Sequence, residues 1–235
     1  MIMANMTMEE FKKAMEDGRP VIIPVGAVEA HGNHLPLATD TIQPEQIAME
    51  VAERIGAVVA PTVNYGVCKS LKNFPGTISL SFDTMRALMR EIIEGFVQHG
   101  AKKIMVISGH AGQSHMIALR EAAYDVVERH DVRVMVFSDY DIAYMYRGKL
   151  VPEDDGHAGT LETSRVLAIM PQWNKKLPGE NVPEYPKFEV VREFERYFPN
   201  CYRGDPSKAS AELGKKINEM IVEHIVDMVR ERWRI

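Results

Sequence analysis

The sequence predicts an α/β protein built on a mostly parallel sheet with helices on both faces. Short apolar runs of strand length alternate with segments whose apolar residues recur at helical spacing. The runs are apolar throughout, which is typical of strands buried on both faces. The chain has 235 residues, 46% of them hydrophobic, and can bury about 70% of its unfolded surface. We find no repeat and no second core, so we expect one domain over residues 1–235.

The order of the elements follows from these patterns. A capping box from Thr7 to Glu10 opens a short first helix. Asp83 is the expected N-cap of a later helix, and Gly56 and Gly100 are expected helix stops. Strands are expected at 21–25, 57–63, 103–109 and 132–138, and helices at 41–56, 81–100, 113–129 and 161–170.

The last third of the chain is expected to hold two different structures. Residues 171–204 are rich in proline and aromatic residues, and we interpret them as an irregular but ordered arm or cover. Asp205 followed by Pro206 indicates an N-cap and the first residue of a final helix. One face of that helix is apolar, with Leu213, Ile217, Met220, Ile221, Ile225 and Met228.

Composition excludes several classes of function. The net charge is -5 and no basic run is present, so nucleic acid is not an expected partner. Cys68 and Cys201 lie far apart in the sequence, which indicates a reducing compartment without a disulfide framework. The N-terminus does not resemble a signal peptide, and the longest uncharged apolar stretch is shorter than the roughly 20 residues that span a bilayer. We therefore expect a cytoplasmic protein with no membrane partner.

Histidines and carboxylates gather near the ends of the predicted strands. Glu29 and His31 come directly after the first strand. His110 follows the third strand, and Asp40 precedes a helix. Because the carboxyl ends of parallel strands meet at one edge of a sheet, we expect these side chains to lie close together. The segment 154–164 adds further candidates, which are Asp154, Asp155, His157 and Glu162.

Imidazoles and carboxylates together suit a Zn, Mn or Fe site. Asp40 could bridge two ions about 3.5–4 Å apart, the spacing of two-metal hydrolases. Ordinary roles are open as well: a histidine after a strand often serves as a hydrogen-bonded loop residue, and Asp40 could be an N-cap. Glu162 could be a solvated acid in a first helical turn, and we interpret His34 as structural or supporting. Spacing alone leaves the metal site and these ordinary roles both open.

Two other kinds of site have less support. Gly109 and Gly112 bracket a strand-to-helix junction that could cradle a phosphate. However, the chain contains no dinucleotide-binding glycine pattern and no P-loop. It also lacks the glycine-serine-glycine elbow of serine hydrolases.

Five motifs, in order and spacing, resemble those of the creatininase superfamily of creatinine amidohydrolases, and a late segment, GDPSKASAELGKKI (204–217), matches as well. The motifs are VIIPVGAVEAHGNHLPLATD (21–40), the YG at 65–66, NFPGTISL (73–80), VISGHAGQS (106–114) and HAGTLETS (157–164).

The resemblance implies a creatininase-like, three-layer αβα fold and an amidohydrolase with a two-metal centre, commonly assembled as a hexamer. By position, Glu29, Asp40 and His110 would hold one divalent ion. His31 and Asp40 would hold the second. Creatininases add a glutamate to the second ion where this chain has Gly112, so Glu162 is the candidate to complete that shell. His157 matches the histidine thought to carry a proton.

The resemblance also implies attack on an amide carbonyl by metal-activated water, with His157 protonating the leaving nitrogen. The family covers opening of the creatinine ring, deformylation of a formamidopyrimidine nucleotide in archaeal flavin and deazaflavin synthesis, and cleavage of a modified peptide precursor. Creatinine hydrolases carry Tyr-Glu where this chain has Ala111-Gly112, and Trp where it has Glu153.

We therefore expect hydrolysis of another small-molecule C–N bond, with the formamidopyrimidine ribonucleotide as the specific candidate. Creatinine and a peptide precursor are the alternatives, and a non-catalytic metal- or nucleotide-binding module is the alternative of another class. Asn73, Ala111 and Asp154 are the expected substrate-binding residues. The resemblance also implies a homo-oligomer, and the aromatic stretch 171–204 adds some support because it would make a poor free surface.

Overall fold

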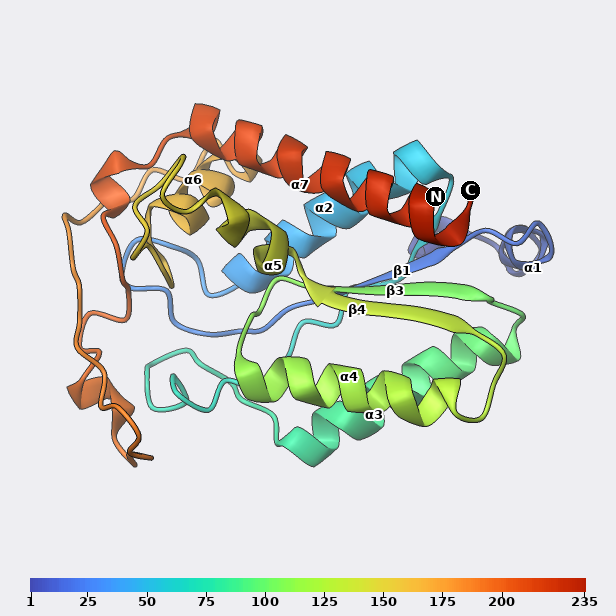
Figure 1. Ribbon diagram of the computed structural model, residues 1–235, viewed down its shortest axis with the longest axis horizontal. Helices are drawn as coiled ribbons and strands as arrows, with labels where there is room; N and C mark the ends of the chain where they lie inside the picture. Colours follow the sequence, from blue (N-terminus) through green and yellow to red (C-terminus); the bar gives the residue numbers. More distant parts are fainter.

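The computed structural model describes residues 1–235 and has three layers, a central sheet between two sets of helices (Figure 1). The sheet has the strand order β2-β1-β3-β4, and every neighbouring pair is parallel. The predicted α/β fold with helices on both faces is confirmed. The strands are β1 (Val21–Val25), β2 (Val58–Val59), β3 (Lys103–Ser108) and β4 (Arg133–Ser138).

Helices α3 and α4 cover one face of the sheet, and α2, α5, α6 and α7 lie on the other side (Figure 1). Helix α1 lies beyond the amino ends of the strands (Figure 1). The helices are α1 (Met8–Glu16), α2 (Thr39–Ile55), α3 (Phe82–Gln98), α4 (Gln113–Val127), α5 (Asp139–Ala143), α6 (Thr160–Ile169) and α7 (Ala211–Trp233). Short 3-10 helices span Met3–Asn5, Tyr144–Tyr146, Phe194–Arg196 and Pro206–Lys208.

The apolar core lies on both sides of β1. Val21, Ile23 and Val25 belong to a cluster that includes residues of α3 and α4. Ile22 belongs to a second cluster, which includes residues of α2 and α7. Successive side chains of a strand point to opposite faces, so a strand between two helical layers is apolar at every position. All five residues of β1 are buried, as the continuous run predicts.

Two predicted boundaries differ from the structure. The strand expected at 57–63 is regular only over Val58–Val59, with one further bridge between Val25 and Val63. Pro61 lies between these two points and has no N–H to donate to a ladder. The N-cap of α3 is Ser81, whose side chain accepts a hydrogen bond from the Thr84 N–H, so the prediction of Asp83 was wrong.

The final helix begins later than predicted. Asp205 and Pro206 open a separate 3-10 turn, and α7 begins at Ala211 with Ser210 as its N-cap. The two pieces are separated because Ala209 is extended. Near its start α7 packs tightly on α6, since a Cβ at Gly214 would lie 1.9 Å from the Ser164 carbonyl oxygen.

The carboxyl ends of the strands point toward the end of the molecule that holds residues 171–204 (Figure 1). This segment contains the short 3-10 helix Phe194–Arg196 and otherwise irregular backbone, as predicted. Its position makes it a wall beside the sheet edge rather than a linker. None of the helices is both long enough and apolar enough to cross a bilayer. One domain over the whole chain stays a prediction.

Candidate metal centre

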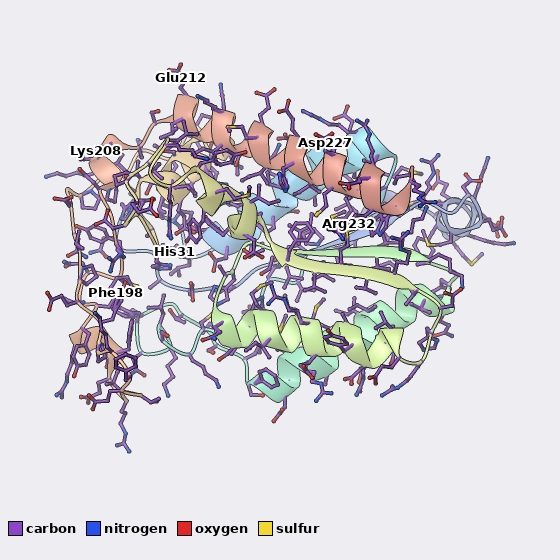
Figure 2. The ribbon with its side chains drawn as sticks, viewed as in Figure 1. His31, Phe198, Lys208, Glu212, Asp227 and Arg232 are labelled. Carbon is purple, nitrogen blue, oxygen red and sulfur yellow. The ribbon has the colours of Figure 1, made fainter.

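The structure brings the five predicted ligands together at the carboxyl end of the sheet, where Figure 2 labels His31. The loop after β1 supplies Glu29 and His31, and the short segment between β3 and α4 supplies His110. Asp40 comes from the first turn of α2, and Glu162 from the first turn of α6. All five are buried: Glu29 (2% exposed), His31 (0%), Asp40 (2%), His110 (8%) and Glu162 (4%).

Two glycines let the first turn of α2 approach the strand ends. A Cβ at Gly109, directly after β3, would lie 2.2 Å from the Asp40 carbonyl oxygen. A Cβ at Gly26, directly after β1, would lie 2.6 Å from the same oxygen. Any side chain at either position would push α2 away. The glycines therefore place Asp40 between His31 and His110.

Asp40 lies between two histidines. Its Oδ1 is 3.0 Å from His31 Nε2, and its Oδ2 is 3.0 Å from His110 Nδ1. The alternative of Asp40 as an N-cap was wrong, because Ala38 is the N-cap and Asp40 lies within the first turn. One carboxylate facing two imidazoles in this way is the arrangement required of a bridging ligand.

Each histidine has a second carboxylate beside it. Glu29 Oε1 lies 3.3 Å from His110 Nδ1. Glu162 Oε1 lies 3.7 Å from His31 Nε2, and ligand atoms of His31, Asp40 and Glu162 lie within 4.8 Å of one another. Two half-sites result, one around each histidine, and they share Asp40.

Backbone carbonyls fix which nitrogen of each histidine faces the carboxylates. His31 Nδ1 lies 3.0 Å from the Glu29 carbonyl oxygen, and His110 Nε2 lies 3.1 Å from the Val67 carbonyl oxygen. A carbonyl oxygen only accepts, so each of these nitrogens donates its N–H. In a neutral ring the other nitrogen then presents a lone pair to the carboxylates. A second hydrogen bond of this kind is what orients metal-binding histidines.

Two buried carboxylate oxygens of this centre have no hydrogen-bond partner, Glu29 Oε2 and Asp40 Oδ2. Burying an unpaired charged oxygen is strongly unfavourable. A cation between these oxygens and the ring nitrogens of His31 and His110 removes this cost. The donors are nitrogen and oxygen atoms, which suit Zn, Mn or Fe. The residues present therefore fit two divalent ions.

The pKa shifts of the clustered side chains reflect the same excess of negative charge. Burial disfavours the charged form of His31, but Asp40 and Glu162 outweigh it and hold the pKa of His31 well above its usual value. Burial also disfavours the charged form of His110, but Glu29 and Asp40 outweigh it and hold the pKa of His110 well above its usual value. Burial disfavours the ionised form of Glu162, yet His31 lowers the pKa of that carboxyl to about 2. Without metal, protons on the histidines balance the carboxylates, and divalent cations would take their place.

His157 lies at the edge of this centre. Its Nε2 donates to the Ala30 carbonyl oxygen at 2.9 Å, which leaves Nδ1 facing Glu29 Oε1 at 3.8 Å. Its ring lies 4.3 Å from that of His31 between centroids, and 23% of its side chain is exposed. His157 is thus placed between the buried ligands and the space in front of them.

A cavity of about 380 Å³ opens over the centre and is lined by Glu29, Asp40, His110, His157 and Glu162 among others. Ala111 lines it, as predicted. Asn73 and Asp154 do not, so their expected role in substrate binding has no support in the structure. Asn73 is exposed and donates to Glu195, and the exposed Asp154 accepts a hydrogen bond from Arg203 at its carbonyl.

Gly112 lies against the ring of His110. A Cβ there would lie 2.4 Å from His110 Nε2, so a longer side chain at this position requires the ring to move. Glu162 approaches the centre from α6 instead. Its Oε2 accepts the Ala158 N–H, which leaves Oε1 toward His31.

Sequence reasoning missed two residues of the site. The Tyr140 hydroxyl donates to Glu162 Oε1 at 2.6 Å and also lies 2.7 Å from Gln43 Oε1. The Cys68 thiol lies within 4.8 Å of ligand atoms of Glu29 and His110. Tyr140 comes just after β4. The expectation that site residues follow strand ends, applied here only to the first and third strands, would have identified it if applied to the fourth.

Comparison with known proteins agrees with this geometry. The family model described as creatinine amidohydrolase matches residues 4–229. The chain is 31% identical to the creatinine amidohydrolase of Pseudomonas putida, over 97% of this chain and 96% of that protein. It is 30% identical to the mycofactocin precursor peptide peptidase of Mycolicibacterium smegmatis, over 91% and 85%.

Solved structures give the same result. A structure described as creatininase Mn superposes with a TM-score of 0.88 at 26% identity, covering 98% of this chain and 97% of that chain. A creatininase mutant of the Zn-Zn type gives 0.87 at 28% identity with the same coverage. The fold, the ligand cluster and these matches agree, and the chain is a hydrolase acting on C–N bonds that belongs to the creatininase family of amidohydrolases.

Proposed function

We propose that this chain hydrolyses a C–N amide bond of a substrate larger than creatinine, using two divalent ions of Zn, Mn or Fe. The ions would be held by the two half-sites around His31 and His110. The observation that carries the proposal is Asp40, whose two oxygens face the two histidines while Asp40 Oδ2 and Glu29 Oε2 receive no hydrogen bond. Related structures described as Mn and Zn-Zn forms support it.

The bound ions would supply an activated water and a positive charge for the developing oxyanion. The side chains do the rest. Tyr140 and the Ala158 N–H hold the two oxygens of Glu162 in place. The Nε2–H of His157 is donated to the Ala30 carbonyl, so Nδ1 is the ring nitrogen at which His157 can carry a transferred proton. From there it can protonate the departing nitrogen.

The cavity supports a substrate with a ring and an anionic group. Tyr185, Phe194 and Phe198 pack against one another in the lining, which also includes Lys69. Aromatic rings bind the face of a flat base, and a lysine ammonium binds phosphate. The volume of about 380 Å³ falls in the range, about 300–1,000 Å³, of cavities that hold drug-sized ligands.

Three nearby carboxylates would repel a phosphate if they faced the substrate, and none does. Glu153 and Asp154 are exposed and lie outside the cavity wall. Asp155 is buried and accepts the N–H groups of Thr160 and Leu161 at the start of α6. The formamide of a formamidopyrimidine ribonucleotide therefore remains the specific candidate.

The test compares three substrates with the metal-supplied protein: the formamidopyrimidine ribonucleotide, creatinine, and a short peptide amide. Asn73→Ala is the matched control, since Asn73 lies outside the cavity. We expect release of formate from the nucleotide and little turnover of creatinine. A creatinine kcat/KM above about 10⁴ M⁻¹s⁻¹, the lower end of the usual enzyme range, would contradict the proposal.

A homo-oligomer, a hexamer by family resemblance, is part of this proposal. Within residues 171–204 the side chains of Phe188 and Val190 are fully exposed, at 106% and 101%. Exposed apolar side chains on an irregular segment favour contact with another subunit. A monomeric mass by light scattering at micromolar concentration would contradict it.

A further inference from the structure

Cys68 is a buried thiol beside the half-site around His110. Its exposed fraction is 2%, like that of Glu29, and both residues line the cavity. The sulfur, a Glu29 carboxylate oxygen and a His110 ring nitrogen all lie within 4.8 Å of one another. Zinc bonds of about 2.0–2.3 Å at tetrahedral angles place ligand atoms about 3.5 Å apart. A small contraction would therefore bring all three onto one ion.

The backbone around Cys68 is held in place on both sides. The Cys68 N–H donates to Ser79 Oγ at 2.9 Å, and the Val67 N–H donates to His115 Nδ1 at 3.2 Å. The Val67 carbonyl accepts the N–H of His110 that fixes the ring. One short segment thus orients the His110 imidazole and also presents the neighbouring thiol to it. These hydrogen bonds fix the position of the sulfur beside the His110 ring.

A second observation points to a ligand at this place. Glu29 Oε2 is buried and accepts no hydrogen bond, although Glu29 lies beside the thiol and the imidazole. An ion held between the three groups would pair this oxygen. The other buried thiol of the chain differs in this respect, because Cys201 donates to the Ala30 carbonyl oxygen and is not grouped with other ligand atoms.

We propose that the Cys68 sulfur is an additional ligand of the metal ion at the His110 half-site. When the ion binds, the S–H bond breaks, the sulfur forms a bond to the metal, and the proton passes to the solvent. The half-site around His31 keeps only nitrogen and oxygen donors. The two positions are therefore chemically different, and thiolate favours Zn over Mn at the position next to His110. This inference rests on the metal centre proposed above and does not depend on the substrate.

The test uses cobalt as the probe, because a thiolate bound to Co²⁺ gives a ligand-to-metal charge-transfer absorption that nitrogen and oxygen ligands lack. Wild type, Cys68→Ser and Cys201→Ser are stripped with chelator, loaded with Co²⁺ and measured by absorption and elemental analysis. Circular dichroism checks that each is folded, and Cys68→Ala replaces Cys68→Ser if the latter does not fold. We expect the charge-transfer band in wild type and Cys201→Ser and its loss in the Cys68 variant. The visible bands of bound cobalt should persist in that variant.

A competition between Zn²⁺ and Mn²⁺ gives an independent readout. In an equimolar mixture the Cys68 variant should retain about tenfold less Zn relative to Mn than wild type, because only wild type has the thiolate. The inference is overturned if cobalt-loaded wild type lacks the charge-transfer band, or if the Cys68 variant keeps it. Failure of all three proteins to bind cobalt would overturn the metal centre itself, whereas loss of the band alone leaves the centre intact.

Discussion

Two buried polar clusters lie side by side in this protein, and only one contains a permanently charged cationic side chain. Arg165 and Asp139 are fully buried and pair at 2.6 Å, and Arg165 also donates to Asn218 at 2.8 Å. The metal centre collects three carboxylates, from Glu29, Asp40 and Glu162, with no arginine or lysine against them. A buried charge requires a partner. The first cluster contains a permanent cation, whereas the second is balanced by protons on its histidines or by cations from outside.

The two clusters meet at Tyr140. The Arg165 guanidinium lies 5.0 Å from the centroid of the Tyr140 ring, and the hydroxyl at the other end of the ring donates to Glu162. The permanent ion pair thus supports a side chain that positions a candidate metal ligand. The comparison teaches that buried carboxylates without an arginine or lysine beside them mark the cation site, and buried charge alone does not.

The largest expected effect is the loss of the shared carboxylate. Asp40→Ala should lose both ions and reduce activity by more than the 10–100-fold typical of residues that only support a ligand. His31→Ala should lose mainly one ion, since its contacts lie in one half-site. Elemental analysis and steady-state assays measure both. A full metal complement in Asp40→Ala would show that the bridge is misassigned.

Breaking the self-balanced cluster should reduce stability instead. Arg165→Met leaves Asp139 buried without its cation, which should lower the free energy of unfolding by about 3–5 kcal/mol. The double variant Arg165→Met with Asp139→Leu should lose less, because no charge remains unpaired. Urea unfolding measures both. Equal losses in the single and double variants would contradict the comparison.

How far the sequence predicted these clusters depends on the range of the contacts. Continuous apolar runs predicted the strands, and the strand-end rule predicted Glu29, His31 and His110, because both depend on neighbouring residues. Asp40 was a candidate because it precedes a helix, and Glu162 was named as a ligand through the resemblance. The Arg165 pair was not predicted, since nothing local distinguishes Arg165 from a surface arginine on an amphipathic helix. Asn73 was expected to bind substrate, but its side chain donates to Glu195 outside the cavity. The sequence could not indicate this contact, because Glu195 lies 122 residues away. The start of α7 was predicted too early because Asp205-Pro206 has the pattern of a helix start but opens only a 3-10 turn.

Removing metal should lower the stability of wild type but not that of a variant that binds no metal. Chelation should destabilise wild type, because an ion at 100 times its dissociation constant stabilises the folded state by about 2.7 kcal/mol per site. Asp40→Ala should show no such change on chelation. Thermal unfolding with and without chelator measures the difference. An equal shift in both proteins would mean that the stabilising ion binds elsewhere.

The smallest expected effect is at the link between the clusters. Tyr140→Phe removes the hydroxyl that donates to Glu162 and keeps the ring over Arg165. Metal affinity should fall about 10–100-fold, as for other residues that orient a ligand. Unchanged affinity by titration calorimetry would show that Glu162 needs no such support.

The most direct test of the central claim is crystallographic. Crystals of the Zn- or Mn-loaded protein, measured at the absorption edge of the metal, should show two anomalous peaks on either side of Asp40, about 3.5–4 Å apart. One peak should lie next to His31 and the other next to His110. No anomalous peak within bonding distance of Asp40 in a protein that is fully active under excess chelator would contradict the account.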